Sequence, residues 1–86
     1  MATITALAFS DQYEYLYVGD SEGVVGVYKL IISQEHLEFS EIRKFQAHQG
    51  RINNIYLQNS ANLMLTSSED GRLKLYNLYS RNGYNI

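Results

Sequence analysis

Apolar and polar residues along this chain fall into short runs that predict β-strands. Apolar residues fill 4–9, an aromatic run covers 13–18 (YEYLYV), and a third run covers 24–30 (VVGVYKL). Turn-forming residues separate them: Ser-Asp-Gln after the first run, and Asp-Ser-Glu-Gly at 20–23, where Gly23 can take a positive φ. The first third of the chain therefore predicts three strands joined by tight turns.

The pattern weakens in the middle of the chain. Residues 31–40 (IISQEHLEFS) predict a strand extension followed by a surface connection. Residues 41–45 (EIRKF) predict a fourth, more exposed strand, because charged residues outnumber its apolar ones, Ile42 and Phe45.

The whole pattern then starts again. Strand signals recur at 52–57, 63–66 and 73–78, with turns at 59–62 and 69–71. The stretches 4–30 and 52–78 align without a gap at an offset of 48 residues, so that Gly23 falls on Gly71 and Tyr28 on Tyr76. A repeat of this length is typical of architectures in which one unit cannot bury its own apolar faces and must stack on neighbours.

No helical pattern interrupts the strands, and the chain contains no proline. Consecutive strands joined by such short turns pair antiparallel. Evenly spaced short strands suit a propeller, a barrel or a sandwich, and the gapless repeat favours the propeller. We therefore expect an all-β chain of two four-stranded antiparallel blades, over 1–46 and 47–86, that do not close a ring. The outer strand of the second blade could come only from 79–86.

Composition narrows the class of protein. The chain has 86 residues, a net charge of −2 and no cysteine, which excludes a disulfide framework and a thiolate metal site. The scattered basic residues disfavour nucleic-acid binding. The N-terminus is a poor signal peptide, and no apolar run approaches the roughly 20 residues that cross a bilayer. These features predict an intracellular, cytoplasmic location and no membrane partner.

Several residues then resemble the WD40-repeat family. The second repeat carries Ala47-His48 where the family has Gly-His, an Asp70-Gly71 turn, and Tyr76-Asn77 where the family has Trp-Asp. The first repeat departs further, with Val18, Glu22 and Tyr28-Lys29 at the corresponding hydroxyl, Asp and Trp-Asp positions. The resemblance covers nearly the whole chain and implies blades of a WD40-type β-propeller.

The resemblance also implies a buried hydrogen-bond network. His48 lies 22 residues before Asp70, Thr66 lies four before it, and Tyr76 lies six after it, as in the family. Asp70 would accept from His48 and from its own turn, His48 would bond to the Thr66 hydroxyl, and Thr66 to the Tyr76 phenol. A His-Asp pair near a hydroxyl also resembles a catalytic triad, but a nucleophile needs a pocket, and this hydroxyl lies in mid-strand.

Without such a network, the first blade would depend on apolar packing. The residues expected to provide it are Ile4, Leu7, Phe9, Leu16, Val18, Val25, Val27 and Tyr28.

Other candidate sites have simpler explanations. His36 and the run Glu35, Glu38 and Glu41 suit a solvated loop, and Gly19, Gly23 and Gly26 lack the lysine and helix of a phosphate loop. No metal and no cofactor are predicted.

The resemblance implies a non-enzymatic platform for other proteins, which usually meet the loops before the inner strands and between the second and third strands. The candidate binding residues are Asp20, Glu22, Gln49, Arg51 and Glu69. The partners would be protein chains, among them the remaining blades, because two blades leave apolar faces open and should not form an independent monomer. Repeats in cilia- and flagella-associated proteins are similar. A propeller in a ribonucleoprotein and a propeller enzyme stay open as alternatives.

Overall fold

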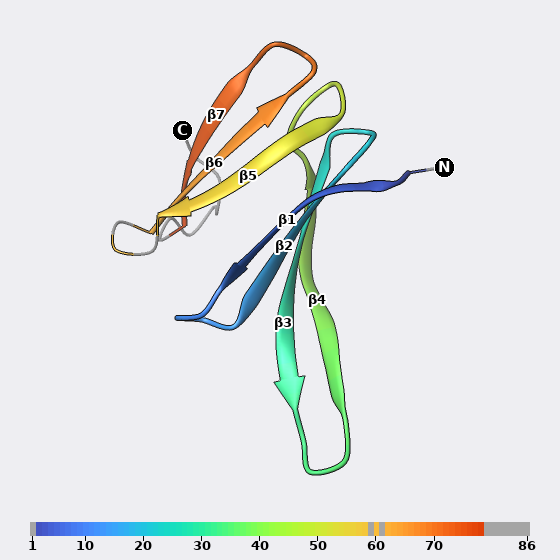
Figure 1. The fold of residues 1–86 in the computed structure, drawn as a ribbon, viewed down its shortest axis with the longest axis vertical. Coiled ribbons are helices and arrows are strands. Elements are labelled where there is room, and N and C mark those ends of the chain that lie inside the picture. Colours follow the sequence, from blue (N-terminus) through green and yellow to red (C-terminus); the bar gives the residue numbers. More distant parts are fainter. Residues whose placement is uncertain (1, 59, 61, 79–86) are drawn as a thin grey trace.

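The computed structural model describes residues 2–58, 60 and 62–78, and these form two antiparallel β-sheets (Figure 1). The first sheet has the strand order β1-β2-β3-β4, and the second has the order β5-β6-β7. Within each sheet every strand pairs with the next along the chain, so both sheets are meanders. The expected outer strand of the second blade, at 79–86, lies outside the described residues. The strand bounds are Ile4–Ser10 (β1), Tyr15–Asp20 (β2), Val24–Ile32 (β3), Leu37–Gln46 (β4), Ile52–Gln58 (β5), Leu63–Ser68 (β6) and Leu73–Asn77 (β7).

One strand runs further than the pattern predicts. β3 continues to Ile32, which confirms the predicted strand extension, but β4 begins at Leu37 rather than at residue 41, so the connection between them shrinks to Ser33–His36. The prediction of a surface connection through residue 40 is wrong. Each strand here supplies the other's backbone hydrogen-bond partners, and this pairing outweighs the polar composition of the segment. The aromatic strand also begins two residues later than predicted, at Tyr15.

The repeat is visible in the turns. Gly23 N–H donates to the Asp20 carbonyl over 3.2 Å, and Gly71 N–H donates to the Ser68 carbonyl over 3.1 Å. Both glycines have a φ near +87°, which is the conformation that favours glycine. These are equivalent turns, one in each sheet, as the alignment of the two halves predicts.

The core lies between the two sheets. It is built from Tyr17, Val25, Val27, Ala47, Ile52, Ile55, Met64 and Tyr76, with Ala6, Ala8, Tyr15, Phe45, Leu57 and Leu78 packed against it. The sheets meet mainly through β1 and β2 against β5. Thr5 Oγ1 adds a polar tie, because it donates to the Ile52 carbonyl over 2.6 Å.

The expected packing of the first blade is wrong for three residues. Ile4, Leu7 and Phe9 are 62%, 59% and 43% exposed, whereas Ala6 and Ala8 of the same strand face the core. Strand residues alternate between faces, and both faces of β1 and β2 are apolar, so the pattern could not tell which face meets the second sheet. Val25 and Val27 are buried as predicted, and Leu16, Val18 and Tyr28 are half-buried.

Candidate functional site

Three turns gather at one end of the two sheets and form a rim. They are residues 20–23 between β2 and β3, 47–51 between β4 and β5, and 68–72 between β6 and β7. All the candidate binding residues that the sequence predicts belong to these turns: Asp20, Glu22, Gln49, Arg51 and Glu69. The rim therefore combines one turn of the first sheet, the linker between the sheets and one turn of the second.

His48 is the centre of the rim and is fully buried. Its Nδ1 lies 3.1 Å from Asp70 Oδ2 and 3.2 Å from Asp70 Oδ1, and its Nε2 lies 2.7 Å from Thr66 Oγ1. A carboxylate only accepts, so Nδ1 carries the hydrogen and donates to Asp70. In the neutral imidazole Nε2 then accepts from the Thr66 hydroxyl, which is itself fully buried.

Asp70 also collects donors from the backbone. Its carboxylate accepts from the N–H groups of Gln49 and Arg72, each over 2.9 Å. Burial by itself would raise the pKa of Asp70, but these two N–H groups and His48 together lower it to about 2. The carboxylate thus stays ionised and fastens the 47–51 linker to the 68–72 turn.

The first sheet is tied to the same linker through Gly23. The Gly23 carbonyl accepts from the N–H groups of Ala47 and His48, over 2.9 and 3.0 Å. A Cβ atom at Gly23 would overlap the His48 carbonyl oxygen, so the backbones approach closely here. Gln46 Nε2 adds a bridge, donating to the carbonyl oxygens of Glu22 and His48, each over 2.7 Å. The sequence analysis did not single out Gln46, and no motif marks it.

The candidate binding residues differ in how exposed their side chains are and in whether they hold their own turn. Asp20 is half-buried, and its Oδ1 accepts from the N–H groups of Glu22 and Val24, so it holds its own turn. Glu22, Gln49, Arg51 and Glu69 are exposed. The Glu69 N–H donates to the Arg51 carbonyl over 2.9 Å, which places these two residues side by side. The side chains of Glu22, Gln49, Arg51 and Glu69 are the part of the rim that another molecule could reach.

Tyr76, the fourth member of the predicted network, is buried on β7. Its ring meets that of Phe45 edge-on, with centroids 5.5 Å apart. Phe45 belongs to β4 of the first sheet, so this pair joins the two sheets behind the rim. A hydrogen bond between Thr66 and the Tyr76 phenol stays a prediction.

The geometry decides what this His-Asp-Thr arrangement can do chemically. The imidazole and the hydroxyl are both 0% exposed, so no substrate carbonyl could approach the Thr66 oxygen. The three side chains hold loops together and satisfy one another's polar atoms. Among the described residues, no group of three or more His, Asp or Glu side chains is placed to hold a metal ion.

Comparison with known families identifies this arrangement. The family model for the WD domain, G-beta repeat (WD40), matches residues 39–77. These 39 of the 86 residues are similar to a WD40 repeat. The match begins in β4 of the first sheet and continues through β5, β6 and β7, so the sequence repeat is offset from the sheet by one strand. No protein of curated function matches the sequence significantly.

WD40 repeats build β-propellers that bind other proteins and are generally not catalytic, and the all-β architecture of two antiparallel sheets in an open arrangement agrees with blades of such a propeller. The 47–51 and 68–72 turns of the rim lie within the matched residues, and the 20–23 turn lies outside them. In the part of the chain that the structure describes, no helix is long and apolar enough to cross a membrane.

Proposed function

We propose that this chain is a segment of a WD40 propeller that serves as a non-enzymatic platform for other proteins, within a multiprotein assembly. The observation that carries the proposal is the fixed rim. Three turns from two sheets are locked by His48, Asp70 and the Gly23 carbonyl, while the side chains of Glu22, Gln49, Arg51 and Glu69 stay exposed. A surface whose backbone is already ordered loses little conformational entropy when a partner binds.

The charges of the rim support a protein partner. The rim carries four carboxylates, Asp20, Glu22, Glu69 and Asp70, and two arginines, Arg51 and Arg72. A phosphate backbone would need a predominantly basic surface, and its binding would weaken steeply with salt. Mixed charges around a fixed backbone suit a polar protein surface with complementary charges. The ribonucleoprotein alternative would require the basic groups to come from other blades.

Both outer faces of the pair also support assembly with further blades. On the first sheet, Leu7 and Phe9 are exposed on the face turned away from the core. On the second sheet, the exposed apolar residues of the outer face are Tyr56, Leu65, Leu73 and Leu75. Such faces favour association in water. The missing partners are therefore further blades, in the same protein or in another chain, and the chain alone is not a stable monomer.

The platform is tested by replacing its two central exposed side chains. Tagged protein carrying Arg51→Ala and Glu69→Ala is expressed in its native cells, and the proteins that co-purify are quantified by mass spectrometry against the unmodified protein. We expect at least one stoichiometric protein partner to be lost from the double variant. Retention of every partner would exclude Arg51 and Glu69 as binding residues. The predicted cytoplasmic or ciliary location is tested by the same tag under the microscope.

The association of blades has its own test. Sedimentation velocity of the purified 86-residue chain should show concentration-dependent association or a lack of cooperative structure. A folded monomer with a cooperative unfolding transition would contradict the need for further blades.

A further inference from the structure

The two sheets are equivalent residue by residue. The pairing of β1 with β2 shifts in register between Ile4 and Ala6, and the pairing of β5 with β6 shifts between Ile52 and Asn54, at the same place in the repeat. The offset of 48 residues that aligns the two halves of the sequence therefore also aligns the two sheets in space. Each face of one sheet has an equivalent face on the other.

One interface between sheets is complete within the chain. The first sheet contributes a face that carries Ala6, Ala8 and Gly19, which we name the alanine face. The second sheet receives it with a face that carries Ile52 and Ile55, which we name the isoleucine face. Both isoleucines are buried there. The interface thus joins small side chains on one sheet to large ones on the other.

The equivalents of these two faces are open. Ile4 and Leu7 stand where Ile52 and Ile55 do in the repeat, but they are exposed on the face of the first sheet that is turned away from the core. A further blade that stacks as the two sheets do would cover this open face with an alanine face of its own. The chain's own interface therefore indicates what kind of blade fits.

A second copy of this chain would bring larger residues to that open face. At the positions of Ala6, Ala8 and Gly19, the second sheet carries Asn54, Tyr56 and Ser67. The residues that would receive them are as large as those of the isoleucine face, because Ile4 replaces Ile52 and Leu7 replaces Ile55. Side chains would be added on one side of the interface and none would be removed opposite them, which overpacks it.

The position of Gly19 is the most restrictive. A Cβ atom there would overlap the side chain of Ile52, so the alanine face needs a residue without a side chain at this point. In a second copy Ser67 would take this place against Ile4. The Cβ of Ile52 is part of the overlap, so no change of rotamer at Ile4 would relieve it.

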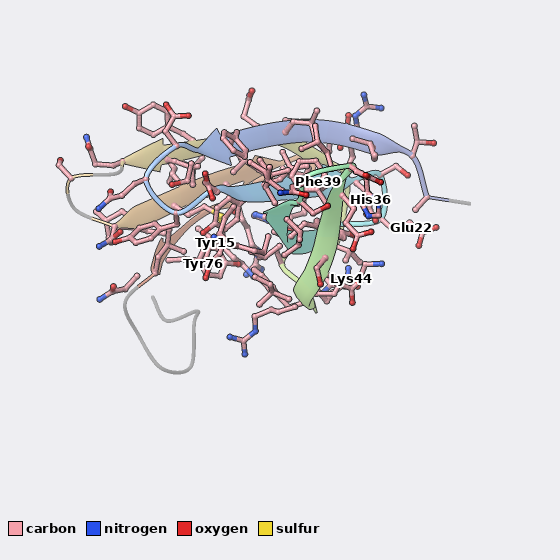
Figure 2. The ribbon with its side chains drawn as sticks, turned by 90° about the horizontal axis from the view of Figure 1, so that it is seen from below. Tyr15, Glu22, His36, Phe39, Lys44 and Tyr76 are labelled. Carbon is pink, nitrogen blue, oxygen red and sulfur yellow. The ribbon has the colours of Figure 1, made fainter. Side chains whose placement is uncertain are left out.

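The aromatic side chains of the alanine face differ in the other direction. Tyr15 and Tyr17 both pack in the core, and Figure 2 shows Tyr15 beside Tyr76 of the second sheet. Their equivalents, Leu63 and Leu65, are smaller. In a second copy they would leave space unfilled without relieving the overlap at the other end of the strand, so the two open faces do not match in shape.

Charge does not select the occupant of the open face. Lys44 and Glu41 lie on this face, opposite Gly26 and Tyr28 in the register of β3 and β4. Lys44 Nζ lies 3.8 Å from the Glu41 carboxylate, so the two charges pair with each other. The choice between occupants is therefore made by shape.

We propose that the open face of the first sheet binds a further blade of different sequence, which places a glycine against Ile4 and small side chains along β1, and that a second copy of this chain does not fit there. This proposal rests on the proposed need for further blades and names the kind of blade. The missing part of the assembly is then unlike residues 47–86.

The first experiment restores an alanine face on the second sheet. The purified 86-residue chain carries Asn54→Ala and Tyr56→Ala together with Ser67→Gly, and the matched control carries Ser67→Ala, which keeps the Cβ atom. Sedimentation velocity over a range of concentrations measures association. The glycine variant should associate at least about fivefold more tightly than the alanine variant. Its oligomers should be discrete, of about two to four copies, because propellers have roughly 4–8 blades.

The second experiment identifies the occupant in the native assembly. These 86 residues contain no cysteine, so Leu7→Cys adds one thiol to the open face, and a thiol-directed photo-cross-linker is attached to it in protein purified from its native cells. Mass spectrometry then identifies the linked peptide. We expect a strand with a glycine and small residues, different in sequence from this chain. Asp11→Cys, in the turn between β1 and β2, should not link to that strand.

Three results would overturn the proposal. The first is equal association of the Ser67→Gly and Ser67→Ala variants. The second is a cross-link from Leu7→Cys to residues 52–68 of a second copy. The third is a cross-link to a strand that has no glycine. A second copy on this face would still satisfy the need for further blades, whereas a folded, cooperative monomer would contradict that need itself.

Discussion

Gly19 of β2 leaves the space that Ile52 of β5 fills. A Cβ atom at Gly19 would lie 2.6 Å from Ile52 Cγ2 and 2.8 Å from Ile52 Cβ, closer than such atoms approach in folded proteins. Ile52 is fully buried, so the contact between the two sheets depends on the absence of a side chain at Gly19. The sequence analysis had only excluded Gly19 from a phosphate-binding loop.

Gly19→Ala should destabilise the protein by about 1–3 kcal/mol, because the added methyl group overpacks a core in which the Cβ of Ile52 cannot rotate away. The measurement is the free energy of unfolding in urea of the protein assembled with its further blades, at one fixed protein concentration. Gly26→Ala is the matched control in the next strand. Its added Cβ would meet the end of the half-buried Tyr28 side chain at 2.9 Å, and that flexible end can move. Equal losses in the two variants would show that the contact with Ile52 is not tight.

Gly23 and Gly71 have nearly the same backbone conformation but different surroundings. Replacing Gly71 with Ala should cost about 1 kcal/mol for the positive φ alone, because nothing lies within 4 Å of its added Cβ. Gly23→Ala adds an overlap with the His48 carbonyl oxygen and should cost about 1–3 kcal/mol more. Urea unfolding of the two variants measures this difference. If Gly71→Ala is the more destabilising of the two, the turn at residues 20–23 and the linker at 47–51 are not in tight contact.

The Thr66 hydroxyl can be tested without changing the shape of the side chain. Thr66→Val keeps the volume but leaves His48 Nε2 buried without its hydrogen bond, so we expect a loss of about 1–3 kcal/mol in the free energy of unfolding. Thr66→Ser keeps the hydroxyl and removes one methyl group, so we expect it to lower the free energy of unfolding by only about 0.8 kcal/mol. A Val variant as stable as the unmodified protein would show that the bond between Thr66 and His48 contributes nothing.

The lowered pKa of Asp70 predicts how the free energy of unfolding changes at acid pH. Its pKa is lowered to about 2 in the folded protein from an ordinary value of 3.8. Between these values the unfolded chain binds the proton and the folded protein does not, so protonation favours unfolding. The contribution of Asp70 to stability is present above pH 3.8 and should be lost as the pH falls toward 2.

The measurement is the free energy of unfolding between pH 5 and pH 2, compared with Asp70→Asn, which should flatten the profile over the acidic part of this range because the titrating group is gone. Asp11→Asn removes an exposed carboxylate from the turn between β1 and β2 and should leave the profile in place. An unchanged profile in Asp70→Asn would assign the acid sensitivity to another group.

Residues close together in the sequence were enough to predict the turns and most of the strands. A glycine that must take a positive φ is visible in the sequence, and both Gly23 and Gly71 have it. The resemblance to the WD40 family, rather than a local signal, named His48, Thr66 and Asp70 as the side chains that the structure brings within hydrogen-bond distance. In contrast, nothing in the sequence marked Gln46, because an amide that bridges two carbonyl groups follows no spacing rule.

The sequence by itself determined that the chain is a repeated series of antiparallel strands, because a period of two residues and well-placed turn residues are properties of neighbours along the chain. Only the tertiary structure decided which face of β1 and β2 is buried, since Leu7 and Phe9 are as apolar as the core residues on the other face. It also decided that residues 37–40 belong to β4. Both outcomes depend on which strands lie side by side, and that choice is made by packing between segments far apart in the sequence.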